Sequence, residues 1–228
     1  MNLKEFVRRY GKPYSKLLGI DLESGRSGEA FKWFLASMLY GKPIRESSAT
    51  KTYRCFEKRR ILTPDKILKT GWDGLVSVLD EGGYTRYDFS TATKLLNIAQ
   101  GLMKMYGGDL NRLHEVALDS RDLEVRIMAL GKGIGPATTS IFLRDMRVIW
   151  LKADPKPTPL VRQAQKSLGI KDLKLYARRS GLNLVRLETA LLRLAKDFLR
   201  RGLPSPVRER IRRLNLGSDS LSRNGAFD

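Results

Sequence analysis

Apolar residues recur every three or four positions along most of this 228-residue chain, and no segment alternates apolar and polar residues as a strand does. One such stripe runs from Phe31 to Met38, with Ser27 placed ahead of it as a helix cap. At Thr63-Pro64, a capping residue is followed by a proline suited to the first helical position. This period restricts the chain to an all-α fold.

Residues that start or stop helices mark the boundaries of the other stripes. Leu95, Ile98 and Leu102 keep the helical period between Tyr87 and Gly107-Gly108, where the glycines are expected to end the helix. After the proline-rich segment 154–159, Thr158 is the residue best placed to cap the next helix. Further helices are predicted near residues 110–118, 121–130, 136–147, 159–168, 171–179 and 184–201.

The charge balance indicates a polyanionic partner. Lys and Arg number 43 against 24 Asp and Glu, a net charge of +19, and phosphate neutralisation is the commonest reason for such an excess. A ribosomal or chromatin-type protein, or an Arg-rich surface, would carry the same excess. The single cysteine, Cys55, excludes an internal disulfide framework, a cysteine-ligated zinc site and an iron–sulfur cluster held by four cysteines.

The sequence contains no sign of a membrane partner. No apolar run approaches the roughly 18 residues of a membrane span, and Met1 begins a polar segment without a signal-peptide core. We therefore expect an intracellular protein, in the cytoplasm or nucleoid, and a monomer.

The most specific feature is the segment from Leu130 to Thr138, in which glycines occupy three alternate positions before Pro136. Glycines permit positive φ and the close approach of a ligand, and the helix that follows presents unpaired N–H groups and a positive dipole end. Ile134 is expected to anchor the turn, and Lys132 adds a charge. An ordinary helical hairpin with a glycine cap is the plain alternative, but the chain's charge favours binding of a nucleic-acid backbone.

With Gly133-Ile134-Gly135, the Thr138 that follows and an Asp beyond an apolar stretch, the chain is similar to the helix-hairpin-helix DNA glycosylases. Endonuclease III and the adenine, 8-oxoguanine and alkyl-base glycosylases belong to that superfamily. The resemblance implies two helical lobes with an interlobe DNA-binding cleft. The expected parts are a terminal lobe of residues 1–26 and 148–215, a central lobe of 27–147 with the hairpin at 130–138, and a flexible tail at 216–228.

The resemblance also implies a catalytic aspartate beyond the hairpin helix, and Asp154 follows the apolar run Val148–Leu151. Cleavage of an N-glycosidic bond develops oxocarbenium character, which a carboxylate stabilises while it orients or deprotonates the attacking water. A turn-forming Asp-Pro is the alternative for Asp154, because the family's Asp lies near a helix start and an insertion follows this one. Asp145 and Asp172 are the other candidates.

Two positions depart from the family pattern at the hairpin. Gly131-Lys132 replaces the usual Leu-Pro, and Ala137 occupies the position of the lysine in bifunctional members. Alanine has no amine to form a Schiff base, so a monofunctional glycosylase is expected. A lyase that uses Lys132 or Lys42 is an alternative. A non-catalytic DNA-binding protein with this scaffold is another.

The remaining expectations also follow from the resemblance. The partner is duplex DNA with a damaged or mispaired base, which the enzyme flips from the stack. No metal or iron–sulfur cluster is required, and a monovalent cation at the hairpin carbonyls is a possibility. The backbone-binding residues are Gly131, Lys132, Gly133, Ile134, Gly135 and Thr138, the void-filling candidates are Lys42, Tyr84, Arg86 and Tyr87, and the base-pocket candidates are Phe31, Trp33 and Tyr40.

Overall fold

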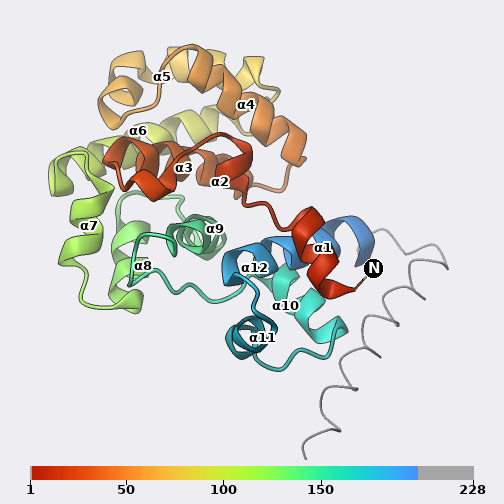
Figure 1. The fold of residues 1–228 in the computed structure, drawn as a ribbon. Coiled ribbons are helices and arrows are strands. Elements are labelled where there is room, and N and C mark those ends of the chain that lie inside the picture. The colour runs from red at the N-terminus through yellow and green to blue at the C-terminus, as the bar shows by residue number, and fades with distance from the viewer. Residues whose placement is uncertain (1, 200–228) are drawn as a thin grey trace, which may run out of the picture. The chain divides into compact units, whose positions relative to one another are not determined.

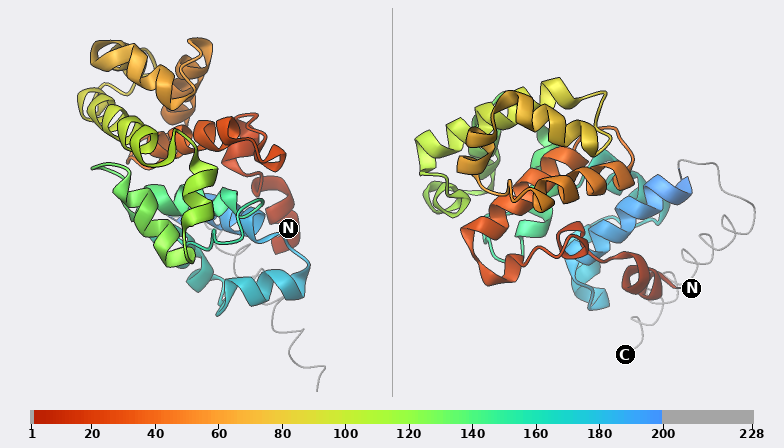
Figure 2. Two further views of the ribbon diagram at one scale, coloured as in Figure 1. Left: turned by 90° about the vertical axis from the view of Figure 1, so that its left-hand side faces the viewer. Right: turned by 90° about the horizontal axis from the view of Figure 1, so that it is seen from above.

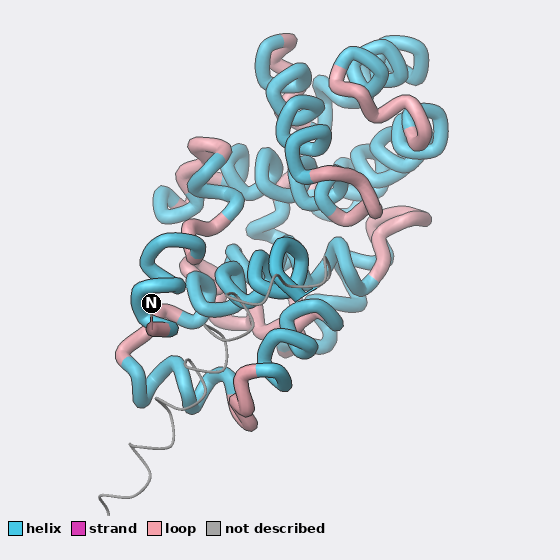
Figure 3. The backbone as a smooth tube through the Cα atoms, turned by 90° about the vertical axis from the view of Figure 1, so that its right-hand side faces the viewer, coloured by secondary structure: helices cyan, strands magenta, loops and turns pink. Residues whose placement is uncertain are grey.

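The computed structural model of the chain describes residues 2–199, and over that range it contains helices and loops without a strand (Figure 3). The predicted all-α class is confirmed for these residues. None of their helices has the length and hydropathy that crossing a bilayer requires. The predicted tail at 216–228 lies outside the described residues.

The chain divides into two compact units. Among the described residues, the terminal unit comprises those up to Leu17 together with those from Pro157 to Leu199, and the central unit is the continuous segment Leu18–Lys156. The central unit therefore extends further at both ends than the lobe of 27–147 expected from the sequence.

The terminal unit is built around α12 (Leu184–Arg193), which packs against three helices from both ends of the chain. These are α1 (Leu3–Tyr10), α10 (Pro159–Ser167) and α11 (Leu173–Ser180), and the unit also holds α2 (Tyr14–Leu17) and a π-helical turn at Leu194–Leu199. One face of α12 is apolar, and Leu187, Ala190 and Leu191 are fully buried there. Burial of this face holds α1 in one unit with α10 and α11.

The central unit is organised around α3 (Ser27–Tyr40), whose neighbours are α9 (Pro136–Met146), α4 (Glu46–Lys58) and α7 (Leu110–Val116). The long helices α5 (Pro64–Glu81) and α6 (Asp88–Tyr106) pack along each other, as Figures 1 and 2 show. The unit also contains η1 (Leu22–Ser24) and α8 (Ser120–Ala129). Trp33, Phe34 and Phe142 form the core between α3 and α9, where the two phenyl rings meet edge to face.

Several predicted helix boundaries are confirmed. The Thr63 side chain accepts from the Lys66 N–H at 3.2 Å ahead of Pro64, and Thr158 accepts from the Val161 N–H at 3.4 Å. Gly107 ends α6 in the left-handed conformation, with φ +63°. These caps satisfy backbone groups that the helix itself leaves without a partner.

The prediction that Ser27 caps α3 is wrong. Ser27 is the first residue of the helix, and Arg26 occupies the cap position without a side-chain hydrogen bond to the helix. The Ser27 hydroxyl instead donates to the Asp109 carboxylate at 2.6 Å. Because Asp109 caps α7, this contact ties the first turn of α3 to the first turn of α7.

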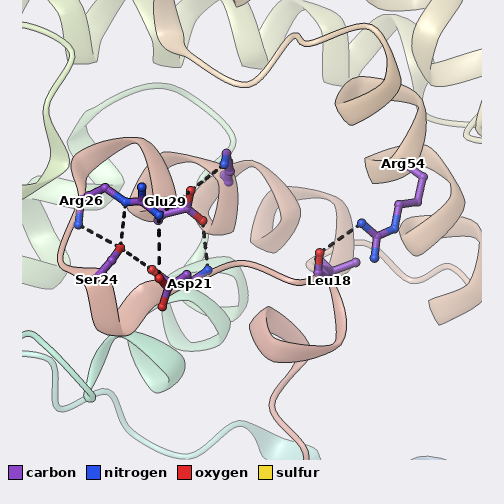
Figure 4. Close-up of polar contacts among 7 residues, drawn as sticks. Leu18, Asp21, Ser24, Arg26, Glu29 and Arg54 are labelled. Atoms are coloured by element: carbon purple, nitrogen blue, oxygen red, sulfur yellow. Dashed lines mark hydrogen bonds and ion pairs between the residues drawn. The ribbon is translucent and has the colours of Figure 1, made fainter.

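A buried carboxylate fixes the segment before α3, as Figure 4 shows. Glu29 accepts from the Asp21 N–H at 3.0 Å and from the Lys32 ammonium at 2.6 Å, and the Ser24 hydroxyl donates to the Asp21 carbonyl at 2.7 Å. Burial acts to raise the pKa of Glu29, but the Lys32 ammonium and the Asp21 N–H outweigh it, so this pKa is lowered. The network holds η1 against the start of α3.

Candidate nucleic-acid interface

The glycine-rich turn at residues 130–135 joins α8 to α9 and lies partly exposed. Ile134 is buried, as expected, and its N–H donates to the Gly131 carbonyl at 3.4 Å, whereas Lys132 and Gly133 are exposed. Gly133 has φ +113°, a conformation that other residues rarely adopt. The turn is therefore anchored from beneath by Ile134 while its tip faces solvent.

Helix α6 passes so close to this turn that side chains are excluded at the points of contact. A Cβ on Gly101 would lie well inside van der Waals contact of the Leu130 carbonyl oxygen. A Cβ on Gly131 would lie 2.7 Å from Ile98 Cγ1, and one on Gly133 would lie 2.5 Å from Lys94 Cδ. The α6 backbone thus supports the turn, and the aliphatic stem of Lys94 lies beside Gly133.

The first turn of α9 follows directly and presents backbone donors. Gly135 is at the cap position and Pro136 is the first helical residue, so the N–H groups of Ala137 and Thr138 have no acceptor within the helix. Ala137 is exposed, while Thr138 is buried beneath Gly41, with its Cβ 3.3 Å from where a Cβ on that glycine would be. These donors and the helix dipole make the start of α9 attractive to an anion.

Two lysines lie near the turn. Lys42 follows Gly41, which contacts Thr138 of α9, and the aliphatic stem of Lys94 contacts Gly133. Burial, together with the neighbouring Lys94 ammonium, lowers the pKa of Lys42 to about 8. An anion placed against both groups would relieve their repulsion, so the pair favours a phosphate at this position.

The loop at residues 82–87 is held tightly. Tyr84 is 1% exposed, and its hydroxyl donates to the Leu39 carbonyl at the end of α3 at 2.8 Å. Tyr84 is therefore a core residue and offers no surface to fill a gap in DNA. Tyr87, at the cap position of α6, is half-buried, and the exposed Arg86 places its guanidinium 5.7 Å from the Tyr87 ring centre.

An exposed aromatic pair lies next to this loop and was missed from the sequence. Phe89, in the first turn of α6, is 60% exposed, and its ring centre is 5.3 Å from that of Trp72 on α5, which is 40% exposed. The Trp72 indole N–H donates to the Thr93 hydroxyl at 3.0 Å. The sequence did contain a signal for the exposure of Phe89. Phe89 is six positions before Leu95, a spacing that puts it on a different side of α6 from the buried apolar residues.

The three residues predicted to line a base pocket are instead packed against, or hydrogen-bonded to, other residues of the central unit. Trp33 is fully buried, and its indole N–H donates to the Phe142 carbonyl at 3.0 Å. Phe31 is buried with its ring 6.5 Å from that of Phe34. The half-buried Tyr40 shares a hydrogen bond of 2.7 Å with the Thr50 hydroxyl. Phe31 and Trp33 thus contribute to the core of the central unit.

Asp154 lies alongside α9, on the segment that runs back from the end of that helix. Its carboxylate is 3.5 Å from the guanidinium of Arg147, which also donates to the Pro155 carbonyl at 2.8 Å. Two residues after Asp154, the carbonyl of Lys156 accepts from the hydroxyl of Ser140, one helical turn from the start of α9, at 3.3 Å. The Asp154 side chain is 41% exposed.

The two other candidate aspartates have structural roles. Asp145 is buried and pairs with the Arg144 guanidinium at 2.8 Å. Asp172 caps α11 by accepting from the Leu175 N–H at 2.9 Å. Of the three, Asp154 is the one that is exposed and also belongs to the central unit, which holds the glycine turn.

Within residues 2–199, no group of three or more His, Cys, Asp or Glu side chains is arranged to hold a metal ion. Comparison with models of known families, with curated proteins and with solved structures gives no match to this chain.

Proposed function

We propose that this protein is a DNA glycosylase that binds duplex DNA through the glycine turn at 131–135 and the first turn of α9. The observation that carries the proposal is the exposed turn itself, on which Lys132 faces solvent and Gly133 lies against the stem of Lys94. Exposed glycine backbone, helix N–H donors and two ammonium groups together form a surface suited to a phosphodiester. The excess of positive charge over the whole chain strengthens the attraction to DNA at longer range.

Asp154 is the catalytic carboxylate of the proposed reaction. It stabilises positive charge on the sugar as the glycosidic bond breaks, and it orients the attacking water. Ala137 provides no amine at the start of α9, so the base is released by hydrolysis. Phe89, Arg86 and Tyr87 occupy the exposed end of α6 and its loop, where they are suited to fill the gap left by a flipped base.

The test is the release of free base from duplexes that each carry one lesion or mispair: uracil, thymine opposite guanine, 8-oxoguanine, adenine opposite 8-oxoguanine, or an alkylated purine. We expect release from one of these classes in a single-turnover assay without added metal. An undamaged duplex of the same sequence is the control. Absence of release from all of them, with duplex binding intact, would contradict the glycosylase proposal.

The second candidate is a non-catalytic duplex-binding protein. It is favoured by the pairing of Asp154 with Arg147 near the end of α9, and by Thr158 as the cap of α10, where the family resemblance expects an aspartate. Such a protein would bind duplexes with and without lesions and release no base from either.

Salt titration tests the phosphate-binding surface separately from catalysis. Removing one phosphate contact lowers the slope of log affinity against log salt concentration by about 1. We expect this change for Lys132→Ala, because Lys132 is exposed on the turn. Lys104→Ala is the matched control, since Lys104 is exposed on the last turn of α6, ten residues after Lys94. Equal slopes for wild type and Lys132→Ala would show that the turn is not part of the DNA-binding interface.

A further inference from the structure

We propose that the exposed rings of Trp72 and Phe89 form a platform on which an unpaired base of single-stranded DNA stacks. The platform goes beyond the proposed function, because it binds a strand that has no partner and takes no part in base release. Phe89 is also one of the residues suited to filling a gap in duplex DNA, whereas Trp72 has no role in that reaction. Trp72 is therefore the residue that distinguishes the two activities.

The exposed indole of Trp72 is held in one orientation. Its N–H donates to the Thr93 hydroxyl at 3.0 Å, and that hydroxyl in turn donates to the Phe89 carbonyl at 3.0 Å. The ring centre of Phe89 lies 5.3 Å from that of Trp72, and the two planes are inclined by 34°. A ring that is already oriented loses little conformational entropy when a ligand stacks on it. The pair is therefore preorganised as a stacking surface.

The backbone leaves the helical conformation directly before Trp72. Gly71 has φ +67° and ψ 177°, a combination confined essentially to glycine, and it interrupts α5. A Cβ on Gly71 would meet no atom within 4 Å, so close packing does not explain the glycine. The glycine instead sets the direction in which the chain enters Trp72.

The platform is continuous with the surface proposed to bind phosphates. Thr93, which orients the Trp72 indole, is followed on α6 by Lys94, and the stem of Lys94 lies beside Gly133 on the glycine turn. All of these residues belong to the central unit. A strand whose phosphates lie on the turn is therefore close enough to place a neighbouring base against the two rings.

The charges near the pair suit a polyanion. Arg86 is exposed three positions before Phe89, and the whole chain carries a net charge of +19. Of the two acidic neighbours, Asp88 accepts from the Phe89 N–H at 2.6 Å, and Asp73 is exposed beside Trp72 in the sequence. Single-stranded DNA combines negative phosphates with unpaired bases whose faces are free to stack. In a duplex those faces are covered by the neighbouring base pairs, so the platform favours the single strand.

Tryptophan fluorescence tests the platform on the full-length chain. Of the three tryptophans, Trp33 and Trp150 are buried and Trp72 is 40% exposed. The protein is titrated with a short oligothymidylate and with an abasic oligomer of equal length, which carries the same phosphates and no bases. We expect oligothymidylate to quench the Trp72 emission and to bind about tenfold more tightly than the abasic oligomer. Equal quenching and equal affinity for the two oligomers would overturn the proposal.

Substitutions at the two rings test stacking against general disturbance of the fold. Trp72→Leu and Phe89→Leu should each lower the affinity for oligothymidylate toward that for the abasic oligomer, because leucine has no aromatic face. Phe89→Tyr keeps an aromatic face and should bind as wild type does. Met105→Ala is the matched control, since Met105 is an exposed apolar residue near the end of α6. Undiminished binding by both leucine variants, with unfolding midpoints like that of wild type, would refute the platform.

The same measurements separate the platform from the glycosylase, because oligothymidylate contains no lesion. Quenching of Trp72 by oligothymidylate without base release from any lesion would refute the glycosylase and leave the platform in place. Base release by a protein whose Trp72 emission oligothymidylate does not quench would refute the platform and leave the glycosylase in place. Quenching by an oligouridylate of the same length, and not by oligothymidylate, would overturn the assignment to DNA.

Discussion

The Asp154→Asn protein should bind lesion-bearing duplex as wild type does but release base about 10²- to 10⁴-fold more slowly in single-turnover assays, because asparagine cannot accept a proton and carries no charge. The substitution weakens a half-exposed ion pair with Arg147 at 3.5 Å. Such pairs contribute little to stability, so the free energy of unfolding should stay within about 0.5 kcal/mol of wild type. Slow base release by an Asp154→Asn protein that is as stable as wild type would show that Asp154 has a chemical role in the reaction.

Asp172→Asn is the matched control for that experiment. Asp172 caps α11, and asparagine caps helices as well as aspartate does, so neither stability nor base release should change. If Asp154→Asn retains the wild-type rate while wild type is active, the catalytic carboxylate is another residue.

Gly101→Ala should lower the free energy of unfolding by about 1–3 kcal/mol, as overpacking at a rigid contact does. In an open helix the same change would be stabilising by about 1 kcal/mol. Here the added Cβ meets the Leu130 carbonyl oxygen, which is backbone and cannot rotate away. The helix and the turn must separate, so duplex affinity should fall together with the unfolding midpoint in a thermal or urea titration.

Gly28→Ala is the control for Gly101→Ala. Gly28 lies in the first turn of α3, and a Cβ there would meet no atom within 4 Å. Stability should be unchanged or higher by up to about 1 kcal/mol. A stabilised Gly101→Ala protein would show that α6 does not support the turn through this contact.

The local elements of the fold were predictable because their signals are local. Thr63 and Thr158 each precede a proline, and this pair of residues fixes a helix start without reference to the rest of the chain. Ser27 failed as a cap because Asp109, more than eighty positions later, accepts from its hydroxyl. A helix cap can therefore be predicted from the sequence only where no residue distant in the sequence forms a hydrogen bond with the side chain of the capping residue.

The candidate site was predictable in part for the same reason. Glycines at alternate positions placed the turn at 131–135, and burial of Ile134 follows from its position between them. Lys94 escaped notice because its stem lies beside Gly133, which is distant in the sequence, and nothing near Lys94 in the sequence distinguishes it from other lysines. Tyr84 was misjudged because its loop suggested exposure, whereas its hydroxyl bonds to Leu39 in the core.

The packing of α1 on α12 implies an order in which the two units fold during synthesis. During synthesis α1 is made before the central unit, and its partner α12 is made after that unit, so α1 can pack on α12 only once the central unit has been synthesised. The central unit is one uninterrupted stretch and is able to fold while the ribosome is still at work. We therefore expect nascent chains to form the glycine turn, and with it an affinity for polyphosphates, before α1 packs on α12.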